Sequence, residues 1–129
     1  MALEDSLKDD IDFLLSLRDN FDGEGAMPPK KKTIDRAINY AKHMTAIVKS
    51  QLGIELITPH LWLGPDASAD AFWRNYDAQR APNKNGEYTI LLNVPPRNAV
   101  PEYYAEFFTD KLHKYEGKLP KNAKELIER

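Results

Sequence analysis

The sequence predicts an α+β fold in which two N-terminal helices pack on an antiparallel sheet of three to four strands. Up to Gly53 the apolar residues recur every three or four positions, which is the period of an amphipathic helix. After Gly53 the chain changes to short apolar runs separated by turn residues, as in a β meander. No internal repeat or low-complexity linker interrupts residues 1–129, so we expect a single domain.

The two helices are expected over residues 3–19 and residues 33–52. Acidic residues gather at the start of the first helix, where the helix dipole favours negative charge. They could also be interpreted as a metal site, but helix N-termini collect acids for the dipole alone, so we predict no metal there. In the second helix Thr33 is expected to be the N-cap, and Gly53 is expected to end it.

Residues 54–95 are expected to form the meander. Gly64-Pro65-Asp66 is a strong turn signal between two strands. Asn85-Gly86 predicts a hairpin turn before the next strand. That strand should end at Pro95, because proline cannot donate to a ladder.

The C-terminal segment, residues 102–129, allows two interpretations. The spacing of Tyr104, Phe108 and Leu112 fits a helix stripe, whereas the density of aromatic residues is typical of a strand. The helix is slightly favoured on periodicity. The tail over residues 122–129 is expected to add a short, partly frayed helical turn.

Composition excludes several classes of function. The chain has no cysteine, which excludes disulfides, thiolate zinc sites and cysteine nucleophiles and is consistent with a cytoplasmic protein. Its 18 basic and 20 acidic side chains give a net charge of -2, which disfavours a nucleic-acid partner. No apolar run approaches the roughly 20 residues that a membrane-spanning helix needs, and the N-terminus lacks the pattern of a signal peptide.

The connector between the two predicted helices contains two glycines, two prolines and three lysines. Gly23-Glu24-Gly25 lacks the further glycine of a dinucleotide fingerprint and the lysine of a P-loop, and it follows a helix rather than a strand. Asp22 is expected to bond its own backbone, Gly23 and Gly25 to adopt positive φ, and Pro28 to stiffen the exit. With Phe21 plugging the junction between helices and sheet, the connector would be a structural clasp.

The segment Asn20-Phe21-Asp22-Gly23-Glu24-Gly25-Ala26-Met27-Pro28-Pro29 resembles an Asn-Trp-Asp-Gly-Tyr-Gly-Ala-x-Pro-Pro signature. That signature recurs in a group of small, largely uncharacterised bacterial proteins, some of them associated with phages and other mobile elements. Phe21 and Glu24 stand where the group has tryptophan and tyrosine. The later segment around Trp73 is also similar to that group. The resemblance implies an α-α-β-β-β architecture and a mobile-element context, and it carries over no catalytic residue.

One grouping of residues could support catalysis or nucleotide binding. His60 lies near Asp66 and Asp70 in the sequence, and strand periodicity could bring the three together as an acid–base site. Lys30, Lys31 and Lys32 precede a helix N-terminus and could attract an anion, although a solvated connector is the favoured interpretation. None of the three histidines belongs to a metal-binding motif, so we expect no metal and no cofactor.

The aromatic residues predict binding to another protein. Tryptophan, tyrosine and arginine are the residues that anchor protein interfaces. A core position is the competing interpretation for Trp62 and Trp73, and it is favoured for either one alone. We therefore predict a small non-enzymatic interaction module, of the inhibitor or immunity type found in mobile elements, that also forms a homodimer. The residues expected to bind are Trp73, Arg74, Tyr76, Tyr104 and Phe108.

Overall fold

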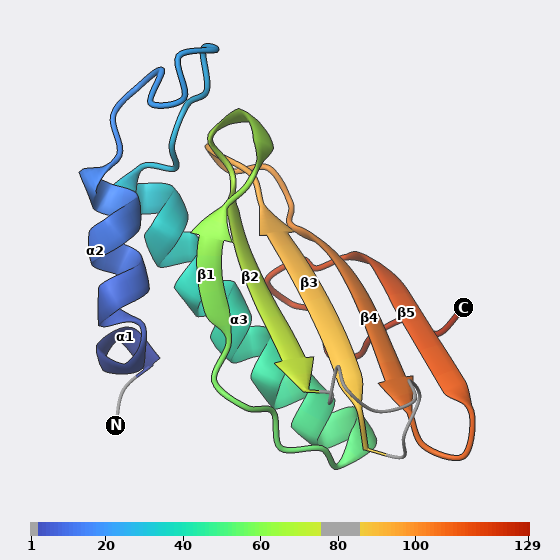
Figure 1. Cartoon of the computed structure of the whole chain (residues 1–129). Helices are drawn as coiled ribbons and strands as arrows, with labels where there is room; N and C mark the ends of the chain where they lie inside the picture. Colours follow the sequence, from blue (N-terminus) through green and yellow to red (C-terminus); the bar gives the residue numbers. More distant parts are fainter. Residues whose placement is uncertain (1–2, 76–85) are drawn as a thin grey trace.

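The computed structural model describes residues 3–75 and 86–129 and has an α+β fold. Three helices precede the strands: α1 (Leu3–Ser6), α2 (Lys8–Ser16) and α3 (Lys31–Leu52). The strands are β1 (His60–Leu63), β2 (Ala69–Asn75), β3 (Tyr88–Val94), β4 (Glu102–Phe108) and β5 (Leu112–Lys118), and a 3-10 helix, η1 (Pro65–Ala67), joins the first two. They form one antiparallel sheet in the order β1-β2-β3-β4-β5 (Figure 1).

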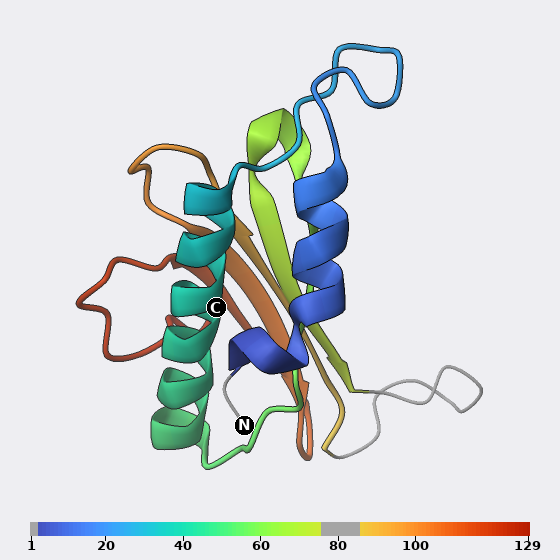
Figure 2. The same ribbon diagram turned by 90° about the vertical axis from the view of Figure 1, so that its left-hand side faces the viewer.

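Helix α3 covers one face of the sheet. It lies behind the strands in Figure 1 and to one side of them in Figure 2, and it contacts β2 and β3. Its apolar stripe, which includes Ile34, Met44 and Val48, is buried against the strands. Gly53 ends the helix as predicted: its φ is 70°, and its amide donates to the carbonyl of Lys49.

The start of α3 differs from the prediction. The helix begins at Lys31 rather than Thr33, and Lys30 is the N-cap, with an extended backbone and no side-chain cap bond. Thr33 is therefore not the cap. Its side chain is almost fully buried in the first turn, so packing against the body of the protein takes precedence over capping.

The predicted first helix, residues 3–19, is also shorter than expected. Leu7 separates α1 from α2 with φ of -102° and ψ of 10°, and its side chain is buried in the core. Helix α2 ends at Ser16, because Leu17 has extended backbone geometry and leads the chain into the connector.

The strands alternate between buried and less buried side chains. In β3 the residues Tyr88, Ile90, Leu92 and Val94 are buried, and Leu91 between them is exposed. The register carries this alternation through β2, β3 and β4. One face of the sheet therefore forms the core with α3, and the other carries the side chains that remain near solvent.

The number of strands and the structure of the C-terminal segment correct the prediction. The sheet has five strands rather than three to four, because residues 102–118 form the β4–β5 hairpin and not a helix. Tyr103, Ala105 and Phe107 are buried at every second position, which is strand periodicity. The helix-like spacing of Tyr104, Phe108 and Leu112 was coincidental, since the first two belong to β4 and Leu112 begins β5.

Both edges of the sheet are covered along part of their length. At β1, the amide of Leu61 donates to the Asp10 carboxylate of α2 at 3.1 Å. At β5, the tail runs antiparallel to the strand through a Tyr115–Glu128 bridge, so it is extended there rather than helical as predicted. Gln51 of α3 holds the same tail through two bonds to the backbone of Leu126. These contacts shield backbone groups that an edge strand would otherwise offer to another chain.

Candidate interaction surface

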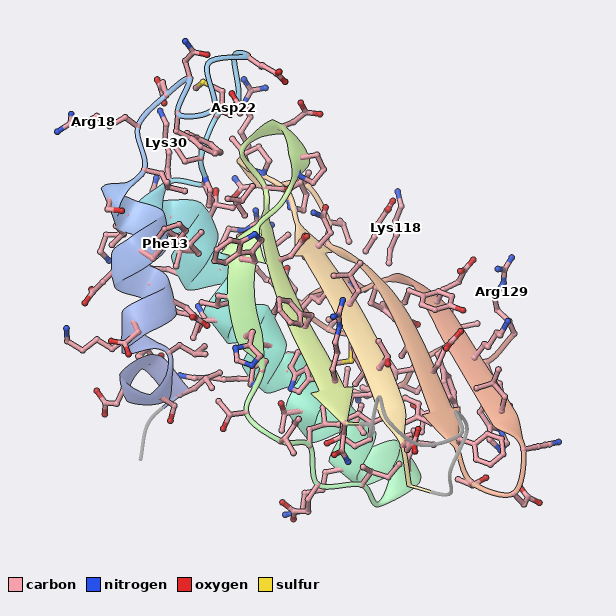
Figure 3. All side chains as sticks on the ribbon, viewed as in Figure 1. Phe13, Arg18, Asp22, Lys30, Lys118 and Arg129 are labelled. Atoms are coloured by element: carbon pink, nitrogen blue, oxygen red, sulfur yellow. The ribbon has the colours of Figure 1, made fainter. Side chains whose placement is uncertain are left out.

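The face of the sheet opposite α3, called the open face below, is the candidate site. Figure 3 views the molecule from this side, and none of the helices or strands in residues 3–75 and 86–129 crosses it. The register defines its rows of side chains. The middle row runs His60, Phe72, Leu91, Tyr104 and Glu116, and the row beside it runs Trp62, Asp70, Asn93, Glu102 and Lys118.

The middle row has an apolar centre. Leu91 is 44% exposed and lies between Phe72 of β2 and Tyr104 of β4, both of which are partly buried. Phe72 is itself flanked by two groups that carry or can carry positive charge. The His60 ring lies 5.4 Å from it, and the Arg74 guanidinium also lies 5.4 Å from its ring centroid. Both neighbours remain exposed, so Phe72 is edged by polar groups that are in contact with water.

A second aromatic group lies where α2 meets β1. Phe13 and Trp62 stack with ring centroids 5.0 Å apart and planes 5° apart. Trp62 is 47% exposed in spite of this contact. The pair extends the apolar surface from the open face onto α2, and Figure 3 shows Phe13 on the side of α2 next to β1.

Tyr104 lies beside both carboxylates and a guanidinium. Its hydroxyl donates to the Glu106 carboxylate at 2.6 Å. The pKa of Tyr104 is raised, first by this hydrogen bond, then by burial and by the charges of Glu106 and Glu116, while Arg129 acts in the opposite direction. A shallow depression of about 620 Å³ lies beside the ring, over β3, β4 and β5.

A polar cluster closes the β1–β2 end of the open face. The Asn93 amide donates to Asp70 at 2.7 Å and lies 2.9 Å from the Ser68 hydroxyl. Burial raises the pKa of the Asp70 carboxyl, and the bond from Asn93 partly offsets this. A Cβ at Gly64 would lie 2.3 Å from the Ser68 hydroxyl, so the cluster requires glycine at this position.

The open face gathers three of the five predicted binding residues. Arg74, Tyr104 and Phe108 belong to the alternate positions that face away from α3. Trp73 has no exposed surface and belongs to the core, so it is not available to a partner and leaves the candidate set. Tyr76 lies outside the described residues.

Sequence reasoning missed Phe13, Phe72 and Leu91 of this surface. It favoured a core position for Trp62, which is wrong, because Trp62 is 47% exposed. The alternation in β2 gave a usable signal: if Trp73 is buried, then Phe72 and Arg74 must share the opposite face. Phe13 had no such signal, because its contact with Trp62 depends on how α2 lies against β1.

The connector, residues 17–30, projects away from the body beyond α2 and α3 (Figures 1 and 2). As predicted, Asp22 bonds the backbone, accepting from the amides of Glu24 and Ala26 at 2.8 and 3.2 Å. Gly23 and Gly25 have φ of 76° and 87°, also as predicted, and Pro28 is buried. The prediction of a structural clasp is wrong in one respect: Phe21 is 37% exposed on the projecting loop and does not fill the junction between the helices and the sheet.

The residues of the alternative catalytic or nucleotide site are not brought together. His60 lies 3.8 Å from Asp10 of α2, and within the described ranges no hydrogen bond or ion pair joins it to Asp66 or Asp70. Lys31 pairs with Asp35 at 3.0 Å, and Lys30 to Lys32 stand at the start of α3 (Figure 3). In Figure 1 the start of α3 lies near the C-terminal end of β1, whereas His60 is the first residue of that strand.

Comparison with known proteins adds no assignment. The chain matches no protein-family model, no curated protein and no solved structure. Within the described residues there is no group of three or more acidic, histidine or cysteine side chains that could hold a metal ion. The described helices also include none with the length and apolar character to cross a membrane.

Proposed function

We propose that the protein is a non-enzymatic interaction module that binds another protein through the open face. The observation that carries the proposal is the apolar centre formed by Phe72, Leu91 and Tyr104, which stays near solvent while α3 covers the other face. Charged side chains surround this centre. An apolar centre with a polar rim is the usual arrangement of a protein interface.

The covered edges favour the face over an edge as the docking surface. Partners that add a strand to a sheet need free backbone groups on an edge strand. Asp10 engages β1, and the tail around Glu128 engages β5. A partner that docks on side chains of the open face displaces neither contact.

The resemblance around Asn20–Pro29 supports a more specific form of the proposal, namely an inhibitor or immunity-type protein from a mobile element. The absence of cysteine fits a cytoplasmic location.

A second copy of the chain is the competing occupant of the open face. An isologous dimer would bury the same centre on both subunits, and sedimentation equilibrium would then give twice the 14.8 kDa of the chain.

Site-specific photo-crosslinking tests the proposal. A photoreactive amino acid at Leu91 reports on the open face, and the same residue at Ala46, which is exposed on α3, is the matched control. In cells that express the protein, we expect a discrete adduct with a different protein from position 91 and none from position 46. An adduct only with a second copy would replace the proposal by the dimer. Equal adducts from both positions, or none, would show that the open face is not a binding surface.

A further inference from the structure

The open face is arranged symmetrically about its central strand. β3 has two strands on either side, and in the middle row Leu91 lies between Phe72 of β2 and Tyr104 of β4. Both neighbours are aromatic and partly buried, whereas Leu91 is 44% exposed. A two-fold rotation about an axis along β3 would bring the open face of a second copy onto this one. It would place Phe72 over Tyr104 and Leu91 over its own equivalent.

Each of the two aromatic rings has one charged group beside it, and the two charges are opposite in sign. The Arg74 guanidinium lies 5.4 Å from the centroid of the Phe72 ring, and the Tyr104 hydroxyl donates to the Glu106 carboxylate at 2.6 Å. Arg74 and Glu106 belong to the same row of the register, because both are opposite Thr89. The same rotation therefore places Arg74 of each copy over Glu106 of the other, which gives two equivalent ion pairs.

The row on the other side of the middle row contributes one favourable and one unfavourable contact. Trp62, which is 47% exposed, would lie under Lys118 of the second copy, and an ammonium group over an indole ring is favourable. Asp70 would lie over Glu102, which repels it. The bond from Asn93 to Asp70 at 2.7 Å offsets part of that repulsion.

The outer strands contribute little to this arrangement. His60 of β1 would lie over Glu116 of β5, but Glu116 already pairs with Arg129 of its own chain. Lys114 is opposite Glu106 on the neighbouring strand, and within residues 86–129 no ion pair joins the two. No strand residue would lie over Lys114, because β1 begins at His60. The fit between two copies therefore depends mainly on β2, β3 and β4.

The size of the face predicts a weak dimer. With five strands about 4.8 Å apart and seven residues in most strands at about 3.3 Å each, the face covers about 500 Å² in each copy. Two copies would bury about 1,000 Å², which is the lower limit for a specific interface. In Figure 1 α2 lies outside the β1 edge, so it leaves the centre of the face accessible. At low concentration the chain should therefore be a monomer with an uncovered face.

We propose that the open face is self-complementary, and that a second copy covers it about a two-fold axis along β3 until the protein partner displaces that copy. This inference rests on the proposed function and adds a regulation of the same face, because the second copy and the partner exclude each other. The dimer is then the free form of the protein at high concentration, and the monomer is the form that binds. Covering the apolar centre also keeps it from water when no partner is present.

Chemical crosslinking of the purified chain tests the position of the axis. Thr89 lies on β3 and would meet its own equivalent across the axis. Because the chain has no cysteine, Thr89→Cys introduces a single thiol. A short bis-maleimide reagent should link two copies of this variant, since packed sheets lie about 10 Å apart. Ala46→Cys, at an exposed position on α3, is the matched control and should stay unlinked.

Charge reversal tests the pairing across the axis. Arg74→Glu and Glu106→Arg each place like charges opposite one another twice, so each should raise the dissociation constant of the dimer by at least about tenfold in sedimentation equilibrium. An equimolar mixture of the two variants should dimerise again, because every contact between positions 74 and 106 then joins opposite charges. Lys114→Glu, which changes a charge beside Glu106 without an opposing strand residue, should change the constant by less than about threefold.

Three results would overturn the inference: a monomer at every concentration, equal crosslinking yields from positions 89 and 46, or a mixture of the two charge variants that stays monomeric. If a charge variant does not fold, the crosslinking yields alone decide.

These outcomes separate the inference from the proposed function. A monomeric chain that still gives an adduct with a different protein from position 91 remains an interaction module, but its open face is not covered by a second copy. A dimer that follows the charges, without an adduct to any other protein, removes the proposed function and leaves the open face as a dimer interface.

Discussion

The same pair of residue types occurs on both faces of the sheet, in two different environments. On the face covered by α3, Leu92 of β3 is paired with Tyr103 of β4. One residue away on each strand, Leu91 is paired with Tyr104 on the open face. Leu92 and Tyr103 are buried at 0% and 5% exposure, whereas Leu91 is 44% exposed.

The difference shows that residue type does not decide the role of these side chains. The covered pair has α3 and the tail beside it, so its apolar surface is removed from water on folding and stabilises the fold. The open pair loses only part of its apolar surface to its neighbours on the sheet. Its remaining apolar surface contributes little to folding, and it would contribute to binding only if the proposed partner covers it.

The largest expected effect separates the two leucines. Leu92→Ala should lower the free energy of unfolding by about 2–5 kcal/mol, because it removes a fully buried side chain and leaves a cavity. Leu91→Ala should cost less than about 1 kcal/mol, because the exposed side chain contributes little packing. Urea unfolding followed by far-UV circular dichroism measures both. Equal losses would mean that the open face is covered in solution.

The tail completes the covered side, and Gln51 tests how much it contributes. Gln51→Ala removes both bonds to the backbone of Leu126 and should lower the free energy of unfolding by about 1–2 kcal/mol. Ser50→Ala, at an exposed neighbouring position on α3, should change it by less than about 0.5 kcal/mol. The two variants are compared by urea unfolding. A silent Gln51 variant would show that the tail is not held against α3.

The two tyrosines give a smaller contrast through their hydroxyl groups. The Tyr103 hydroxyl accepts from the amide of Ile127 at 3.0 Å, so Tyr103→Phe leaves that amide unpaired and should cost about 1 kcal/mol. Tyr104→Phe removes only the bond to Glu106 at the surface and should cost less than about 0.5 kcal/mol. Thermal melts of both variants provide the check. A larger loss for Tyr104 would reverse the roles given to the two faces.

The sequence predicted the parts of this fold that depend on local signals. The stripe of α3 and the cap at Gly53 follow from helix periodicity and from glycine's access to positive φ. The two strands around Gly64-Pro65-Asp66 and the end of β3 before Pro95 follow from turn chemistry and from the missing proline donor. Asn85 of the predicted hairpin turn lies outside the described residues.

The remaining features depend on contacts between distant segments. For the β4–β5 hairpin the helix was favoured over the strand, because aromatic residues spaced by three or four positions also fit a helix. The strand alternation of β4 appears only in its burial, which depends on pairing with β3. The open face could not be predicted either. Its existence depends on which side α3 covers, and the choice between Tyr103 and Tyr104 changes with a register shift of one residue.

The smallest expected effect concerns the pH dependence of stability at the edge of the open face. Burial raises the pKa of Asp70 in the folded protein. The stability linked to this group is therefore fully present below the pKa of the unfolded chain, about 3.9, and is lost as the pH rises through the folded value. The side chain in Asp70→Asn stays neutral. The free energy of unfolding of this variant should therefore increase relative to that of the wild type as the pH rises through the folded pKa of Asp70.

The expected gain at neutral pH is less than about 0.5 kcal/mol, because Asp70 is only partly buried. Urea unfolding at a series of pH values between about 3 and 7 measures the difference between variant and wild type. Asp66→Asn, on the exposed turn nearby, controls for the loss of one negative charge. If the wild type instead became more stable than the variant as the pH rose, the hydrogen bond from Asn93 would outweigh burial in setting the pKa of Asp70. Asp70 would then be held as a charged group on the open face.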